Sequence, residues 1–218
     1  MKEFVILGAN HFALSMILET LLVKHGPSSI FIYSNTDHNE HKEKGIPYAA
    51  PGLTIFERSM SQFEVSDKPC FIAGMSSRSR KAIYEDFSKV VPDHLLEPLI
   101  YPNVILASTC EIGFGVRIEN NVSINPFAKI GNLAFINRAV TVGHHTNIGN
   151  FTNINPGAHI TGSCDIGAGV TIGAGAIVND GISIGEGSII GSGSVVTRNI
   201  PAGVVAFGCP AKIIKEVE

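Results

Sequence analysis

One spacing governs the second half of the sequence: an aliphatic residue recurs every six residues with no break in phase. The series runs Ile100, Leu106, Ile112, Ile118, Ile124, Ile130, Ile136, Val142, Ile148, Ile154, Ile160, Ile166, Ile172, Val178, Ile184, Ile190 and Val196. The period-two alternation of an ordinary sandwich strand does not produce this pattern. It indicates short strands that each point one aliphatic side chain inward, so that three strands close a triangular coil of about 18 residues. We therefore expect a left-handed parallel β-helix over residues 100–201, without a long inserted loop.

The turns between these strands should contain residues that tolerate unusual backbone angles. Glycine or asparagine often follows the aliphatic residue directly, as in Ile112-Gly113 and Ile124-Asn125. Both residue types accept the positive φ that tight turns require. We expect the left-handed turn residues at these positions.

The first half of the sequence has a different texture, with mixed charge and helix-like patterns. Strand patterns at residues 3–7, 29–33 and 70–73 alternate with helix patterns at residues 12–24 and 78–90. Gly8 and Gly74 end strands directly before helices. Strand–glycine–helix units of this kind predict a parallel sheet. The expected organisation is a Rossmann-like α/β domain over residues 1–99, the β-helix over residues 100–201, and a C-terminal tail over residues 202–218.

Composition narrows the classes of function. A net charge of −3 argues against a nucleic-acid binder. No apolar run reaches the roughly 20 residues that span a bilayer, and the first residues lack a signal-peptide pattern, so we expect no membrane insertion. The four cysteines are far apart and form no Cys-x-x-Cys pair, which is typical of a reduced, cytoplasmic protein.

Three stretches resemble a known family. They are Ile136-Asn137 together with Val142-Gly143-His144-His145-Thr146-Asn147-Ile148-Gly149, then Phe71-Ile72-Ala73-Gly74, and then Gly208-Cys209-Pro210-Ala211-Lys212. With the α/β unit and the unbroken repeats, they make the chain similar to the NeuD/PglD-like sugar O-/N-acyltransferases of the hexapeptide-repeat class. The resemblance implies an acyltransferase that uses acetyl-CoA as donor and a nucleotide-linked sugar as acceptor, assembled as a homotrimer with active sites between neighbouring prisms.

The resemblance also assigns roles to residues. His144 matches the catalytic histidine, seven residues after Asn137, which would contact the acceptor. A neutral imidazole suits a general base that takes a proton from the attacking amine or hydroxyl. The amide of Gly162, one coil beyond His144, would face the thioester carbonyl. His144 could instead be a surface histidine, and Asn137 an ordinary turn residue.

Other candidates rest on position. Coenzyme A carries several phosphate charges, and Arg198 and Lys212 near the end of the β-helix could pair with them, or they could only add surface charge. Gly8, Asn10, His11 and Gly74 lie at strand ends, where amides before a helix can hold a phosphate, or they could form plain turns.

The sequence departs from the family at several of these positions. The first turn reads Gly8-Ala9-Asn10-His11-Phe12 and lacks the family's second glycine. His145 stands where many relatives have glutamate, so it could orient His144 or simply be solvated. Asn153 stands where a second family histidine is found, and we assign it to cofactor binding.

Three alternatives remain beside N-acetylation of an amino sugar. The acceptor could be a sugar hydroxyl, as in sialic-acid O-acetylation, or the β-helix could be a non-catalytic scaffold. Some left-handed β-helices are zinc carbonic anhydrases, but His144, His145 and His159 do not have the spacing of a three-histidine zinc site. We expect no metal, and we interpret His159 as a surface residue.

Overall fold

The computed structural model describes residues 1–34, 52–64 and 66–217. The chain divides into two compact units, Met1–Leu99 and Ile100–Glu218. The first unit is built on a four-stranded parallel sheet with strand order β3-β2-β1-β4. Its elements are β1 (Lys2–Leu7), α1 (His11–His25), β2 (Ser28–Ser34), β3 (Leu53–Ser59), the short 3-10 helix η1 (Met60–Gln62), β4 (Cys70–Ile72), α3 (Ser77–Phe87) and a second 3-10 helix, η2 (Asp93–Leu95).

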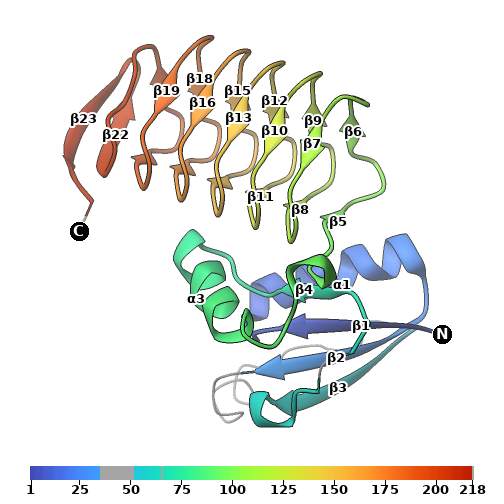
Figure 1. Cartoon of the computed structure of the whole chain (residues 1–218). Helices are drawn as coiled ribbons and strands as arrows, with labels where there is room; N and C mark the ends of the chain where they lie inside the picture. Colours follow the sequence, from blue (N-terminus) through green and yellow to red (C-terminus); the bar gives the residue numbers. More distant parts are fainter. Residues whose placement is uncertain (35–51, 65, 218) are drawn as a thin grey trace. The chain divides into compact units, whose positions relative to one another are not determined.

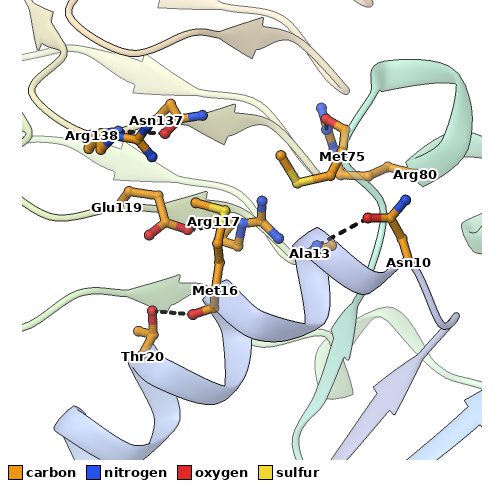
Figure 2. A network of polar contacts seen from close by, with 10 residues as sticks. All are labelled: Asn10, Ala13, Met16, Thr20, Met75, Arg80, Arg117, Glu119, Asn137 and Arg138. Atoms are coloured by element: carbon orange, nitrogen blue, oxygen red, sulfur yellow. Dashed lines mark hydrogen bonds and ion pairs between the residues drawn. The ribbon is translucent and has the colours of Figure 1, made fainter. Parts of the chain in front are cut away.

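Helix α1 shows why this sequence forms the first unit. The side chain of Asn10 caps its first turn by accepting a hydrogen bond from the amide of Ala13 at 3.1 Å, as Figure 2 shows. Gly26 ends the helix with a φ of +72°, a backbone conformation that glycine adopts at little cost. Leu14, Ile17 and neighbouring apolar side chains are fully buried in the core that includes the inner strands β1 and β2.

The α/β unit agrees with the sequence prediction in type, and differs in two details. Strand β3 was not predicted; it is an edge strand whose side chains are mostly half-exposed or exposed, so it lacks the apolar run of a central strand. Helix α3 ends at Phe87 rather than at residue 90, because the amides of Val90 and Val91 both turn back to the carbonyl of Phe87.

The second unit is a left-handed parallel β-helix, as the six-residue period predicts (Figure 1). Its strands are two residues long: β5 (Leu99–Ile100), β6 (Ile105–Leu106), β7 (Glu111–Ile112), β8 (Arg117–Ile118), β9 (Ser123–Ile124), β10 (Lys129–Ile130), β11 (Phe135–Ile136), β12 (Thr141–Val142), β13 (Asn147–Ile148), β14 (Asn153–Ile154), β15 (His159–Ile160), β16 (Asp165–Ile166), β17 (Thr171–Ile172), β18 (Ile177–Val178), β19 (Ser183–Ile184), β20 (Ile189–Ile190) and β21 (Val195–Val196). They form the three faces of a prism: a five-stranded sheet (β19-β16-β13-β10-β7), a six-stranded sheet (β21-β18-β15-β12-β9-β6) and an eight-stranded sheet.

The prism interior is filled by the aliphatic series and by the small residues four positions after each member. Some of these small residues are polar, and their hydroxyl groups are satisfied inside the core. The hydroxyl of Thr146 donates to the carbonyl of Thr161 at 2.9 Å, and that of Thr152 donates to Gly167 at 2.8 Å. A buried hydroxyl with a partner carries no desolvation penalty of the kind that an unpaired one would.

The prediction for the turns was wrong in its position and in its reason. Positive φ occurs three residues after the aliphatic residue, at Gly157 and Gly169, and also at residues with side chains such as Phe127, Ala139 and His145. The glycines directly after the aliphatic residues have another cause. A methyl group on Gly143 would lie 2.4 Å from the carbonyl carbon of Thr161 in the next coil. These glycines are required because neighbouring coils approach too closely for a side chain.

The predicted C-terminal tail forms a hairpin that continues the eight-stranded sheet. Strand β22 (Val204–Gly208) pairs in parallel with β20, and β23 (Ala211–Glu216) pairs with β22 in antiparallel fashion. The hairpin therefore closes one edge of the prism at its final coils.

Two glycine substitutions should separate the two kinds of glycine. A methyl group at Gly149 would lie 2.5 Å from the backbone nitrogen of Ala168, whereas one at Gly187 would meet nothing within 4 Å and would strain only its φ of +69°. Gly149→Ala should destabilise the chain by about 3 kcal/mol, and Gly187→Ala by about 1 kcal/mol. Chemical or thermal unfolding of both variants measures the difference; equal losses would show that the coil spacing relaxes freely.

Candidate active site

One corner of the prism carries one residue from each of four successive coils, and the pairing of the preceding strands identifies them. Parallel pairing places Thr141, His159, Ile177 and Val195 next to one another in the six-stranded sheet. Three residues after each of them, the chain turns toward the five-stranded sheet. His144, Gly162, Asp180 and Arg198 therefore form a column along this corner, which we call the His144 column. At a strand spacing of about 4.8 Å, Arg198 lies roughly 14 Å from His144 along the prism.

The imidazole of His144 lies directly against Gly162 of the next coil. A methyl group on Gly162 would come within 2.7 Å of Cε1 and 2.8 Å of Nε2 of His144. Gly162 is buried, whereas His144 is exposed. Because Gly162 has no side chain, the His144 ring can pack against its backbone. The Nε2 edge of the ring faces this backbone.

His145 contacts His144 through a ring-to-ring hydrogen bond. The two Nδ1 atoms are 3.1 Å apart, so one must carry a proton and the other must accept it. His145 has a φ of +56°, its amide donates to the carbonyl of Pro126 at 3.0 Å, and its ring lies 4.9 Å from the ring of Phe127. These contacts hold His145 beside His144, which the sequence left open.

The amide of Gly162 is engaged in this structure. It donates a hydrogen bond of 2.7 Å to Oδ1 of Asp180, the next residue of the His144 column. The role implied for Gly162, a donor to the thioester carbonyl, therefore requires that this carboxylate moves away. Arg198 is the last residue of the column, and its side chain is exposed. It therefore lies on the same corner as Gly162.

Asn137 lies at a different corner from His144. It directly follows β11 of the eight-stranded sheet, whereas His144 follows β12 of the six-stranded sheet. Its side chain is buried, and its Oδ1 accepts a hydrogen bond from the amide of Arg138 at 2.9 Å, as Figure 2 shows. One copy of the chain therefore presents Asn137 and His144 at the two ends of the same prism face, which we call the β12 face.

A carboxylate that the sequence analysis did not single out lies next to Asn137. Glu119 occupies the equivalent position one coil earlier, because β8 pairs with β11 in register. Both Glu119 and Arg117 are buried, and the Nε of Arg117 lies 3.2 Å from Oε1 of Glu119 (Figure 2). Burial raises the pKa of Glu119, while the charges of Arg117 and Arg138 oppose that rise.

In the first unit, the candidate residues gather at one edge of the sheet. Leu7 of β1 pairs with Ile72 of β4, so Gly8 and Gly74 follow neighbouring parallel strands at their carboxyl ends. Ligands of open α/β sheets bind at this edge. Both glycines are packed tightly: a methyl group would lie 2.7 Å from the Ile83 side chain at Gly8 and 2.8 Å from the Arg80 amide nitrogen at Gly74.

Two of these groups already have internal partners. The amide of Gly8 donates to the carbonyl of Tyr33 at 2.8 Å, so it is not available to hold a phosphate. The side chain of Asn10 caps α1. His11, the first residue of α1, is half-buried, and its ring packs against Phe12 with centroids 5.4 Å apart.

The remaining candidates lie away from the His144 column. Asn153 is buried in β14 of the eight-stranded sheet, and Lys212 is exposed on β23 of the same sheet. Within residues 1–34, 52–64 and 66–217, no three histidine, cysteine, aspartate or glutamate side chains gather as metal ligands. None of the helices in these ranges is long and apolar enough to cross a membrane.

A groove of about 530 Å³ lies on the five-stranded face, not at the His144 column. It follows the glycines that end its strands, Gly113, Gly131, Gly149 and Gly167, and polar residues such as Lys129 and Asp165 line it. The groove is a consequence of the glycine spacing, and it includes none of the candidate site residues.

Comparison with known proteins agrees with this architecture. Residues 145–180 and 163–198 match the family described as bacterial transferase hexapeptide (six repeats). PerB from Caulobacter crescentus, in complex with CoA and GDP-perosamine, is 26% identical with a TM-score of 0.76, over 98% of this chain and 97% of that chain. This chain is an acyltransferase whose prism contains hexapeptide repeats.

Two further solved structures share the fold of this acyltransferase. The acetyltransferase domain of PglB from Neisseria gonorrhoeae, in complex with acetyl coenzyme A, has a TM-score of 0.80 at 23% identity, over 98% of each chain. WeeI from Acinetobacter baumannii AYE has a TM-score of 0.75 at 22% identity, over 98% of this chain and 100% of that chain. No curated protein sequence matches the chain. The resemblance to NeuD/PglD-like sugar acyltransferases is confirmed.

The sequence analysis missed two residues that lie next to candidate site residues, although a signal for them exists. Asp180 and Glu119 lie at multiples of 18 residues from His144 and Asn137, respectively. Once one residue of a column is known, steps of 18 residues along the sequence therefore identify the others.

Substitution of the two adjacent histidines should produce different losses. His144→Ala should lower kcat by about 10²-fold or more, because a general base typically contributes that much, while coenzyme A binding stays intact. His145→Ala should cost less, since it removes only the partner that orients His144. His145→Glu should retain activity and move the acidic limb of the pH–rate profile to higher pH, because a carboxylate raises the pKa of a neighbouring imidazole.

The exposed His159 serves as the matched control for these variants. Its Nδ1 is hydrogen-bonded to the hydroxyl of Thr141 at 2.9 Å, on the six-stranded face. His159→Ala should behave as the parent chain. An inactive His145→Ala beside a fully active His144→Ala would mean that the catalytic assignment is displaced by one residue.

Proposed function

We propose that this acyltransferase moves the acetyl group of acetyl-CoA to the amino group of a nucleotide-linked amino sugar, with His144 as general base. The proposal is supported by the packing of the His144 ring against the backbone of Gly162 and by the hydrogen bond between the rings of His144 and His145. The similarity to PerB, which binds CoA and GDP-perosamine, supports the donor and the class of acceptor.

The hydrogen bond between the two histidines supports a defined proton arrangement. When Nδ1 of His144 carries the proton and donates to Nδ1 of His145, Nε2 of His144 keeps its lone pair. Nε2 is also the edge that faces Gly162. In this tautomer His145 accepts the bond that a glutamate accepts in many relatives, and it stabilises the ring orientation without adding a charge.

The reaction then follows from these groups. Nε2 of His144 removes a proton from the amine as the amine nitrogen attacks the thioester carbonyl carbon. The C–N bond forms while the carbonyl oxygen becomes an oxyanion, which a backbone amide stabilises. The intermediate collapses, the C–S bond breaks, and the thiolate of coenzyme A takes the proton that His144 holds. The products are an N-acetyl sugar nucleotide and coenzyme A.

The His144 column supports a path for the donor. Arg198 lies in the same column, roughly 14 Å along the prism from His144, and it can pair with a phosphate of coenzyme A while the thioester reaches Gly162. Lys212 on β23 adds a second exposed cation in the final part of the chain. The acyl donor thus belongs to the β-helix in this proposal.

The acceptor's nucleotide belongs to the first unit. The carboxyl ends of β1 and β4, with Gly74 and His11 beside them, form the edge at which open α/β sheets bind nucleotides. The amide of Gly8 is excluded as a phosphate ligand by its bond to Tyr33. His11 and the amides near Gly74 are the groups that we expect to contact the nucleotide.

An assay with a defined panel tests the function. Thiol release from acetyl-CoA should be observed with a GDP-, UDP- or dTDP-linked amino sugar, and the matching hydroxyl sugar should react at least about 10²-fold more slowly. With the free nucleotide alone, protection from hydrogen exchange should appear in residues 1–99. Turnover of the hydroxyl sugar at an equal rate would favour the O-acetyltransferase alternative.

The geometry of the β12 face supports a homotrimer in which two copies share each site. Asn137 and His144 lie at opposite ends of this face, so the acceptor can meet both residues only when Asn137 of one copy approaches His144 of another. Closed threefold symmetry repeats that contact at three equivalent places. In such an assembly the β12 face is directed toward the symmetry axis.

Mixing of two inactive variants tests this arrangement. Asn137→Ala and His144→Ala should each be impaired, while trimers refolded from an equal mixture should regain about a quarter of the parental activity, because some interfaces then pair an intact Asn137 with an intact His144. Asn137→Ala alone should raise the acceptor KM more than the donor KM. Failure to recover any activity from mixed trimers, confirmed as trimers by sedimentation, would show that each copy holds a complete site.

A further inference from the structure

A carboxylate occupies the backbone amide of Gly162, the glycine of the His144 column against which the imidazole packs. Oδ1 of Asp180 accepts from this amide at 2.7 Å, a short distance that is typical of hydrogen bonds with a charged partner. The Nε2 edge of His144 and the carboxylate of Asp180 thus approach the same glycine from its two neighbouring coils.

Equivalent turn contacts elsewhere in the prism use neutral side chains. The amide of Asn132 donates to Oδ1 of Asn150 at 2.8 Å, and the amide of Phe114 donates to Oδ1 of Asn132 at 3.2 Å, both with the same spacing of one coil. An asparagine is therefore sufficient where the contact only satisfies a turn amide. The charge at Asp180 is an extra feature of the column that contains His144.

We propose that Asp180 competes with the acyl donor for the Gly162 amide, so that the donor's carbonyl oxygen must displace the carboxylate before transfer. The inference rests on the proposed function and adds a residue that controls the donor step. A neutral thioester carbonyl is a weaker acceptor than a carboxylate. The amide is therefore withheld from the resting donor and is needed most when the oxyanion forms.

The displaced carboxylate has a place to go. Asp180 is exposed, so its side chain can turn to solvent, and Arg198 is the next residue of the column with a fixed positive charge. Departure from Gly162 is also required by electrostatics, because a carboxylate next to the developing oxyanion would repel it. Asp180 thereby weakens the binding of the resting acyl donor and leaves the binding of coenzyme A, which has no acyl carbonyl, almost unaffected.

The test compares two ligands that differ by the acyl group. Acetyl-CoA has the carbonyl that competes for the amide, and coenzyme A does not. Asp180→Ala should tighten acetyl-CoA binding by about tenfold, and coenzyme A binding should change less than twofold. Asp180→Asn, which keeps an acceptor oxygen but removes the charge, should tighten acetyl-CoA binding by about threefold. Calorimetry with each ligand measures these ratios.

A control and a second measurement keep the result interpretable. Asp165→Ala removes an exposed aspartate from β16, on another face, and should leave both affinities unchanged. Without any ligand, Asp180→Ala should shift the amide resonance of Gly162 in a ¹H–¹⁵N spectrum, because the hydrogen bond is lost, while unfolding temperatures show that the fold persists.

Three outcomes would overturn the inference. An unchanged Gly162 resonance in Asp180→Ala would mean that the bond does not exist in solution. Equal effects on acetyl-CoA and coenzyme A, or weaker acetyl-CoA binding in Asp180→Ala, would mean that Asp180 does not compete with the carbonyl. If the parent chain binds neither ligand, the proposed function fails and this inference fails with it. If the parent chain binds both ligands and Asp180→Ala changes the two affinities equally, only the inference fails.

Discussion

The stacking of one coil on the next by parallel backbone hydrogen bonds is the constraint on which the second unit depends. The amide of Asn147 donates to Cys164, that of Asp165 donates to Ile182, and the same step recurs along every face. The step fixes a register of 18 residues, as in the pairing of Asn147 with Asp165. Residues that are distant in sequence are thereby held in straight columns, with no helix or loop needed to position them.

This register makes the site from very few side chains. A single missing side chain, at Gly162, provides both the seat for the His144 ring and access to a backbone amide. His145 is held by its positive φ and by contact with the tilted ring of Phe127 in the preceding coil. Catalytic geometry in such a prism is set by the backbone ladder, and the side chains occupy the places that the ladder defines.

The sequence predicts much of this fold because its six-residue apolar period follows from the hydrogen-bonded stacking of the coils. The strands of the prism and the parallel α/β sheet were predicted, since each depends on buried aliphatic residues in a regular pattern. Strand β3 was missed because an edge strand buries little. The turn glycines were misread because their reason is the approach of a neighbouring coil, as at Gly143, which no local pattern reveals.

For the candidate site, sequence reasoning reached the residues but not their surroundings. The spacing of Asn137 and His144 was visible, yet only the topology shows that the two lie at different corners of the prism. The hydrogen bond from Gly162 to Asp180 depends on a side-chain rotamer and on the stacking of two coils. Such contacts are decided in three dimensions, after the register has placed the residues side by side.

The turn positions with positive φ can accept new side chains without a change in the coils. In the earlier coils many of these positions carry side chains, including Phe127, Ala139 and His145, whereas later ones such as Gly175, Gly187 and Gly193 are bare. A methyl group at these three glycines would meet nothing within 4 Å, so the only cost of a new side chain is about 1–2 kcal/mol of backbone strain. The turn positions of the later coils thus have room for side chains. Substitutions there, in evolution or by protein engineering, can add binding groups without altering the coils.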